Sequence, residues 1–423
     1  MSQSIPTIET ALAATRVLAA TFAKGAAEAD RQASLPVDNF KALHAAGVLS
    51  LVIRKDQGGL GGGLEAAIDA VSTVAQGEPA TALILAMHYI QHGQIAFDQG
   101  FWPTAVADVL IRSSLERGAL INAAYVDATK GSLSHGALPE TVARQQGGQW
   151  LLSGHKKYVT GIDALSWIRV AGVTDEPQPR VGYFLVPADA PGIRVERTWD
   201  TLGMRATSSQ DVIFDNVPLP LEHFFGAVPV GAPRQHGPLD AVWYLALVAA
   251  VYHGVAQAAR NAFIDFTTGF IPGSLGAPLA SLPRFQDALG EIEAAQRVSH
   301  RLLFGLGRDY DELVAREDRK QIEERLNGDA DVARLVVLRN SAQVTALALE
   351  LAGNQGLSRN NALERHHRDA LSAKAHGPNA SLLKAALVRY GLKQQGKEWP
   401  PAAPAVPAAP AAQTAQLSGT AVA

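Results

Sequence analysis

The sequence of 423 residues contains no cysteine, which excludes disulfides, cysteine nucleophiles, thiolate-bound metals and iron–sulfur clusters. Charged residues are scarce at 18%, and a net charge of −3 provides no basic surface for nucleic acid or anionic membranes. Hydrophobic residues make up 47% of the chain, so it can bury a sizeable core. These proportions indicate a folded protein with no nucleic-acid partner.

Long hydrophobic runs are also absent. The longest uninterrupted one, from Ala241 to Tyr252, is well short of the roughly 20 residues that a membrane span needs. The first ten residues have neither a basic stretch nor an apolar run, so no signal peptide is visible. We therefore expect a cytoplasmic protein without membrane contact.

The local pattern changes along the chain. Residues 1–115 repeat apolar residues at helical spacing, residues 116–230 hold short runs rich in Val, Ile and aromatics, and residues 231–395 are helical again. Residues 396–423 are rich in Ala and Pro, which is typical of a flexible tail. The pattern predicts an α+β multidomain fold: an N-terminal helical domain, a middle antiparallel β-barrel or sandwich, and a C-terminal four-helix bundle.

Two local features refine this organisation. The C-terminal bundle divides into four predicted helical segments, 239–266, 282–306, 331–352 and 362–390. Asn327-Gly328 is interpreted as a helix stop between two of them. The glycine cluster at 58–63 is interpreted as a connecting loop rather than a phosphate loop, because the GxxxxGK[ST] motif is missing.

Five phrases of the sequence follow one another between about residues 20 and 390. They are ADRQASLPVDNFKALHAAGVLSLVIRKDQGGLG, WLLSGHKKYVTG, LGMRATSSQDVIFDNVPLP, GVAQAARNAF and LELAGNQGLSRNNALERHHRDA. In this order they resemble the acyl-CoA dehydrogenases. The resemblance implies the same helix–barrel–helix fold and a flavin cofactor, FMN or FAD.

The resemblance also implies which residues contact the flavin. Tyr158 would stack against the isoalloxazine, Thr160 would hydrogen-bond near N5, and Ser132 would lie near flavin and substrate. An isoalloxazine does need an apolar wall and a partner near N5. The alternative is that residues 158–160 are simply the end of a strand. Residues 126–128 depart from the family's usual Thr-Glu-Pro beside Ser132.

The family's pyrophosphate-binding pattern is eroded in this sequence. Its Arg-x-x-Phe-Gly is replaced by TTGFIPGSLGAPL, which contains no Arg. Glu350 stands where the family has Gln, and an acid there repels a pyrophosphate. Gly353 allows close approach of a neighbour's cofactor or ends a helix, and Asn379 completes the predicted cofactor contacts.

The catalytic carboxylate of the dehydrogenases is missing at both positions where the family places it. Gly377 stands at one and Tyr244 at the other, and a phenol is a poor base at neutral pH. Asp240 lies one helical turn before Tyr244, about 6 Å away along the axis. The α-proton of an acyl thioester therefore lacks an evident base.

His376 stands beside this missing carboxylate. His376-Gly377-Pro378 after the Arg-Asp motif resembles the monooxygenase branch of the fold, typified by dibenzothiophene monooxygenase, and the resemblance implies that His92 faces the same cavity. An imidazole can hydrogen-bond a flavin peroxide that a carboxylate would repel. The alternative for His376 is a helix C-terminal cap. His88 and His92 share a helical face, but without a third ligand nearby we expect no metal.

These observations favour a two-component monooxygenase. It would receive reduced flavin from a separate NAD(P)H-dependent reductase, react with O2 to a flavin C4a-(hydro)peroxide, and oxygenate a small substrate. One alternative is an acyl-CoA dehydrogenase with a non-standard base; another is a catalytically degenerate flavin-binding or scaffold subunit. Because the family pairs its C-terminal helices across subunits, we expect a homotetramer.

Overall fold

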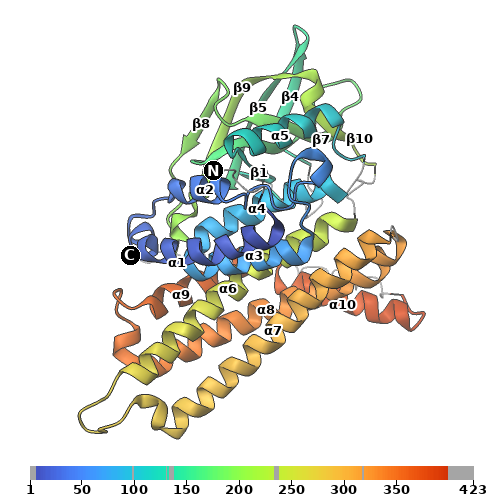
Figure 1. Ribbon diagram of the computed structural model, residues 1–423. Helices are drawn as coiled ribbons and strands as arrows, with labels where there is room; N and C mark the ends of the chain where they lie inside the picture. The colour runs from blue at the N-terminus through green and yellow to red at the C-terminus, as the bar shows by residue number, and fades with distance from the viewer. Residues whose placement is uncertain are drawn as a thin grey trace, which may run out of the picture.

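The computed structural model describes residues 6–97, 100–129, 131–132, 138–232, 238–316 and 319–398. Figure 1 shows three layers: the β-sheet at the top, the N-terminal helices in the middle, and long C-terminal helices at the bottom. The predicted order of a helical, a β and a second helical region is confirmed. The limits of the individual domains stay predictions.

The N-terminal layer consists of helices that pack on one another and on the layer below. The helices are α1 (Ile8–Gln32), α2 (Val37–Ala45), α3 (Leu64–Gly77) and α4 (Pro79–Phe97). Helix α5 (Thr104–Arg117) follows them and packs against the sheet (Figure 1). Thr7 and Thr10 form a reciprocal capping box that starts α1. The glycine cluster is a connecting loop, as predicted: the amides of Gly61 and Gly62 donate to the carbonyls of Ile53 and Leu51 and are not free for a phosphate.

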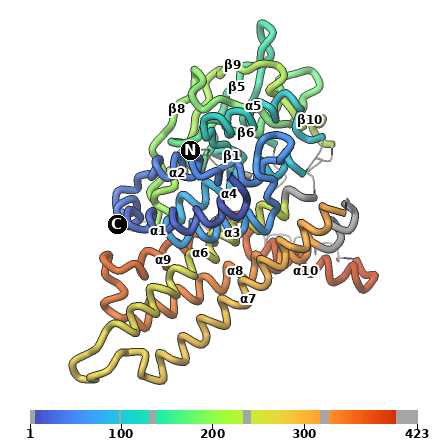
Figure 2. The backbone as a smooth tube through the Cα atoms, in the orientation of Figure 1, coloured from blue at the N-terminus to red at the C-terminus, as the bar shows by residue number. Residues whose placement is uncertain are grey.

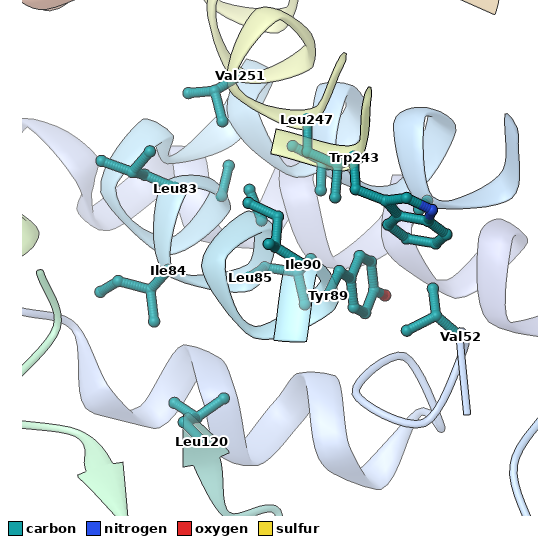
Figure 3. Packing of buried hydrophobic residues seen from close by; sticks show 14 of the residues in the cluster. Val52, Leu83, Ile84, Leu85, Tyr89, Ile90, Leu120, Trp243, Leu247 and Val251 are labelled. Atoms are coloured by element: carbon teal, nitrogen blue, oxygen red, sulfur yellow. The ribbon is translucent and has the colours of Figure 1, made fainter. Parts of the chain in front are cut away.

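Helix α4 lies at the centre of the hydrophobic core, and almost all of its residues are buried. Figure 3 shows side chains of α4 between those of Trp243, Leu247 and Val251 on one side and Leu120 on the other. The helix therefore contacts both the sheet and the C-terminal layer. Such all-round burial explains why α4 is apolar on every face.

The sheet layer is, within the described residues, one ten-stranded sheet. Its strands are β1 (Leu120–Ala124), β2 (Val126–Asp127), β3 (Gly131–Ser132), β4 (Val142–Gln146), β5 (Gln149–Val159), β6 (Leu165–Thr174), β7 (Arg180–Pro187), β8 (Ile193–Glu196), β9 (Gln210–Pro220) and β10 (Phe224–Pro229). Most neighbours are antiparallel, as predicted. The β1–β6 and β4–β6 pairs are parallel, which strand spacing alone does not reveal.

The C-terminal layer contains three long helices and two short ones, which Figure 2 traces from yellow to red. They are α6 (Pro238–Gly269), α7 (Pro283–Ala315), α8 (Arg319–Gly356), α9 (Ala362–Leu371) and α10 (Ala380–Gln394). Helices α6 and α8 are by length and composition apolar enough to cross a membrane, over 241–269 and 328–356. The α6 window is 83% buried inside the protein, as in the core helix of a globular fold, whereas the α8 window is 39% buried.

Two predictions about this layer are wrong. Helix α8 runs through Asn327-Gly328 without stopping, because Leu326 and Ala330 on either side are buried and their packing offsets a glycine cost of about 1 kcal/mol. The predicted segment 362–390 is broken into α9, the short helix η6 (Ser372–Ala375) and α10. Pro378 disfavours helix in the residue before it, and Asn379 then caps α10.

Candidate functional site

Strand β5 leads into a strained, exposed aromatic residue. Tyr158 has a φ of 59°, which is costly for a residue with a large side chain, and it is 55% exposed. The pairing of β5 with β9 shifts register between Lys156 and Val159, which turns Tyr158 outward. Its ring meets Trp199 edge-on with centroids 6.4 Å apart. An exposed flat ring held in this way can stack against a planar ligand.

A row of three hydroxyl groups begins two residues after Tyr158. The Thr160 Oγ1 is 2.9 Å from the Ser209 Oγ, which is 2.8 Å from the Thr207 Oγ1. The Asn122 side chain donates to the Thr160 carbonyl at 3.0 Å and fixes this backbone. Strand β5 ends at Val159, so residues 158–160 are a strand end and also bring an aromatic wall next to hydrogen-bonding groups.

A buried ion pair joins strand β5 to strand β2. The Lys156 Nζ donates to the Asp127 Oδ1 at 2.7 Å, both side chains are buried, and the Thr141 hydroxyl donates to the same oxygen. Burial lowers the pKa of Lys156, and the Asp127 carboxylate opposes that shift. Asp127 therefore provides a carboxylate in the part of the chain that departs from the family's Thr-Glu-Pro.

The three layers meet around the Arg-Asp motif of α9, which is Arg368-Asp369. The Asp369 Oδ1 accepts the Met204 N–H at 2.6 Å from the sheet layer. Arg368 donates to Asp30 of α1 through two nitrogens, at 3.0 and 2.6 Å, and to the Leu202 carbonyl at 2.9 Å. This junction fixes the loop that carries Thr207 and Ser209 against α9.

The Asp369 carboxyl should make stability depend on pH. Burial raises its pKa to about 7, above the unfolded value of about 3.9. The folded protein then binds the proton more tightly between those values, so unfolding free energy falls as pH rises to 7 and levels off above it. Asp369→Asn keeps the acceptor for Met204 and removes the titration. Urea unfolding of both proteins at several pH values should show the unmodified protein losing stability relative to Asp369→Asn as the pH rises to 7, with a constant difference above it; parallel profiles would contradict the assignment.

A second group of side chains surrounds His376, between η6 and α10. The His376 ring lies 5.7 Å from the Tyr252 ring of α6, and Tyr244 of the same helix lies under the Arg334 guanidinium at 5.2 Å. The Arg334 Nη2 donates to the carbonyls of His376 and Gly377 at 2.9 and 3.1 Å. Gly377 and Tyr244, the positions of the missing base, are thus both within this group.

The electrostatics of this group keep the His376 imidazole neutral. Burial, and secondly the positive charge of Arg334, lower the pKa of His376 to about 4. A neutral imidazole at physiological pH carries one N–H donor and one acceptor nitrogen. The group can therefore donate a hydrogen bond, and neither Gly377 nor Tyr244, which stand at the family's two base positions, offers a carboxylate to remove a carbon-bound proton.

His92 lies on α4, inside the N-terminal layer, and that it faces the same cavity as His376 stays a prediction. Its ring is buried 4.4 Å from the His88 ring, and His88 in turn contacts the Leu49 carbonyl at 3.1 Å. Burial lowers the pKa of His92 well below its ordinary value. Among the described residues, no hydrogen bond or ring contact joins His92 to His376, and no cluster suited to a metal ion is present.

The remaining predicted cofactor contacts lie outside the two groups. Asn379 accepts from the amides of Ser381 and Leu382 and so caps α10. Glu350 is exposed on α8, and Gly353 interrupts that helix with a φ of 56°. Ser132 pairs with Val126 across β2 and β3, but its side chain lies outside the described residues, as does that of Asp240.

Sequence reasoning missed Arg334 and Tyr252. Arg334 is wholly buried, and it is the one charged residue in the apolar run VARLVVL at 332–338. A lone charge in a buried helical stretch is a signal for a functional or structural contact. Tyr252 gave no comparable signal, because it continues the apolar pattern of α6.

Comparison with known proteins identifies the family. Models of the N-terminal, middle and C-terminal domains of acyl-CoA dehydrogenase match residues 9–97, 124–217 and 246–379. "Putative acyl-CoA dehydrogenase YdbM" of Bacillus subtilis is 30% identical over 361 residues, which are 85% of this chain and 91% of that protein. The chain belongs to the acyl-CoA dehydrogenase family.

Solved structures of this fold include flavin-dependent oxygenating enzymes. FMN-bound TdsC of Paenibacillus sp. A11-2, a dibenzothiophene monooxygenase, superposes with a TM-score of 0.81 at 21% identity, covering 91% of this chain and 97% of its own. A nitrososynthase from Micromonospora carbonacea has a TM-score of 0.79 at 23% identity, covering 92% and 97%. At these identities the likeness concerns the fold. Together with the family, the comparisons support a flavin cofactor and a flavin-dependent oxidoreductase.

Proposed function

We propose that this member of the acyl-CoA dehydrogenase family is a flavin-dependent monooxygenase rather than a dehydrogenase. The observation that carries the proposal is the group around His376. It puts a neutral imidazole beside Gly377 and Tyr244, where a dehydrogenase needs a carboxylate. The monooxygenase TdsC and the nitrososynthase, which share the fold, support the same reaction class.

The residues present fit a flavin. The exposed Tyr158 ring offers a stacking wall, and the Thr160 hydroxyl, two residues further along the chain and paired with that of Ser209, offers a hydrogen-bonding group. When bound in its reduced form, the flavin supplies the electrons that activate O2. The neutral His376 ring would donate a hydrogen bond at this site, and the aromatic rings of Tyr244 and Tyr252 would exclude water from its side. A separate NAD(P)H-dependent reductase supplies the reduced flavin.

The oxygen reaction tests this proposal. Reduced flavin bound to the protein and mixed with O2 should regain its oxidised spectrum only after a delay that free flavin lacks. A substrate that is oxygenated should shorten the delay and suppress release of hydrogen peroxide. If the bound flavin reoxidises without delay, as rapidly as free flavin does, the monooxygenase proposal fails.

Flavin binding should favour the smaller cofactor. Because the pyrophosphate-binding Arg is missing and Glu350 is exposed, FMN should bind at least as tightly as FAD, and both should be readily lost. Titration of the apoprotein with each flavin measures this. Tyr158→Ala should weaken both by roughly tenfold, the equivalent of about 1.4 kcal/mol, whereas Tyr158→Phe keeps the wall. Tight FAD binding without FMN affinity would contradict the prediction.

We also propose that the protein is a cytoplasmic homotetramer. Large apolar side chains stay exposed on α10 and after α8, and these are Leu357, Leu382, Val388 and Tyr390. Less than half of the apolar α8 window is buried within one chain. Exposed apolar side chains on α10 and an incompletely buried α8 leave surface that further copies of the chain could cover. Light scattering should give four times the chain mass; a monodisperse monomer at micromolar concentration would contradict it.

A further inference from the structure

The segment that carries His376 is held by one side chain. It lies between η6, which ends at Ala375, and α10, which begins at Ala380, and its backbone carbonyls need donors. The Arg334 Nη2 donates to the carbonyls of both His376 and Gly377, at 2.9 and 3.1 Å. Arg334 comes from α8, so the bonds tie this segment to a long, well-packed helix.

Burying Arg334 is costly. Its side chain has no exposed surface, and its Nε and Nη1 have no hydrogen-bond partner among the described residues. None of the ion pairs in the described part of the chain includes Arg334. An unpaired buried charge costs several kcal/mol. The interactions made in return are those with the two carbonyls, with the side chain of Tyr244 and with the negative charge of Asp331.

We propose that Arg334 is the positioning residue of this site: its two hydrogen bonds fix the His376–Gly377 segment and so the place of the His376 ring. Its positive charge adds to burial, the larger cause, in disfavouring protonation of that ring. The inference rests on the proposed function. Arg334 itself has no exposed atom through which to contact a substrate, so it acts through His376.

The charged and titratable groups around His376 agree with this role. Arg334 and Asp331 come from α8, Tyr244 and Tyr252 from α6, and Lys374 from η6. Burial raises the pKa of Tyr252 well above its ordinary value, so its ring stays uncharged. Burial also raises the pKa of Asp331 to about 6. The positive charge of Arg334 is the second cause, after burial, of the low pKa of His376.

Two substitutions separate charge from position. Arg334→Gln removes the charge and retains a donor, and Arg334→Lys retains the charge with a shorter, single amine. Proton NMR titration of the His376 imidazole in the apoprotein needs no flavin or O2. The His376 pKa should rise by at least one unit in Arg334→Gln and stay low in Arg334→Lys. Arg339→Gln, at an exposed position on the same helix, is the matched control and should change nothing.

The oxygen reaction tests position independently. In Arg334→Lys the delay before flavin reoxidation should shorten by at least tenfold although His376 stays neutral, because one amine does not reproduce the guanidinium geometry. An unchanged delay in folded Arg334→Lys would overturn the positioning role. An unchanged His376 pKa in folded Arg334→Gln would overturn the charge role. If Arg334→Gln does not fold, the delay measured in Arg334→Lys decides whether Arg334 has the positioning role. The NMR result stands even if the protein proves to be a dehydrogenase, so the two failures are distinguishable.

Discussion

Replacing His376 with alanine should shorten the delay before flavin reoxidation by roughly 10²–10³-fold, because removal of one hydrogen-bond donor to a developing oxyanion costs that much. The ring is available for this role: its neutral form carries a donor, and the Arg334 bonds occupy only its backbone carbonyl. Stopped-flow absorbance of the reduced, flavin-loaded protein mixed with O2 measures the delay.

Two further variants show whether the ring itself is responsible. His376→Gln keeps a donor and should recover part of the delay. His44→Ala removes a histidine that bonds the Leu115 carbonyl in the N-terminal layer and should leave the delay unchanged. A purely structural His376 would instead lower the melting temperature of His376→Ala and leave its delay equal to that of the unmodified protein.

Replacing Arg368 with alanine should destabilise the protein by about 3–5 kcal/mol, the cost of removing one partner from a buried ion pair. Arg368 is paired with Asp30 of α1 and Glu364 of α9, and all three side chains are at most 14% exposed. Its loss leaves two carboxylates facing each other where the three layers meet. Urea unfolding followed by circular dichroism measures the change.

The exposed pair of Arg194 and Glu196 on β8 is the matched control. The Arg194 side chain is 63% exposed, and ion pairs at such sites contribute about 0–1 kcal/mol. Arg194→Ala should therefore unfold at nearly the same urea concentration as the unmodified protein. Equal effects of the two substitutions would show that the junction around Arg368 does not hold the layers together.

The sequence predicts most of the architecture, because helix and strand periodicity are local properties of the chain. It fails where packing overrides a local signal, as in the uninterrupted α8 around Gly328, and where pairing is non-local, as in the parallel strands beside β6. The break before α10 could have been predicted from the sequence, because Pro378 disfavours a helical conformation in the residue before it.

The site was predictable in part. Tyr158 and Thr160 lie at the end of β5 and His376 lies between η6 and α10, and that they contact flavin or substrate stays a prediction. Arg334 escaped notice because its bonds to the 376–377 carbonyls join residues more than 40 positions apart. His92 shows another limit of the sequence. Helical spacing places it on the same helix face as His88, but spacing does not say which layer that face packs against.

Anaerobic mixing of the oxidised, flavin-loaded protein with acyl-CoA thioesters, such as butyryl-CoA and palmitoyl-CoA, tests the central claim most directly. A dehydrogenase removes the α-proton and transfers hydride to the flavin, which loses its visible absorbance. With Gly377 and Tyr244 at the two base positions, no thioester should bleach the flavin. Bleaching by any of them, abolished in Asp240→Asn, would contradict the monooxygenase account and identify a dehydrogenase with a relocated base.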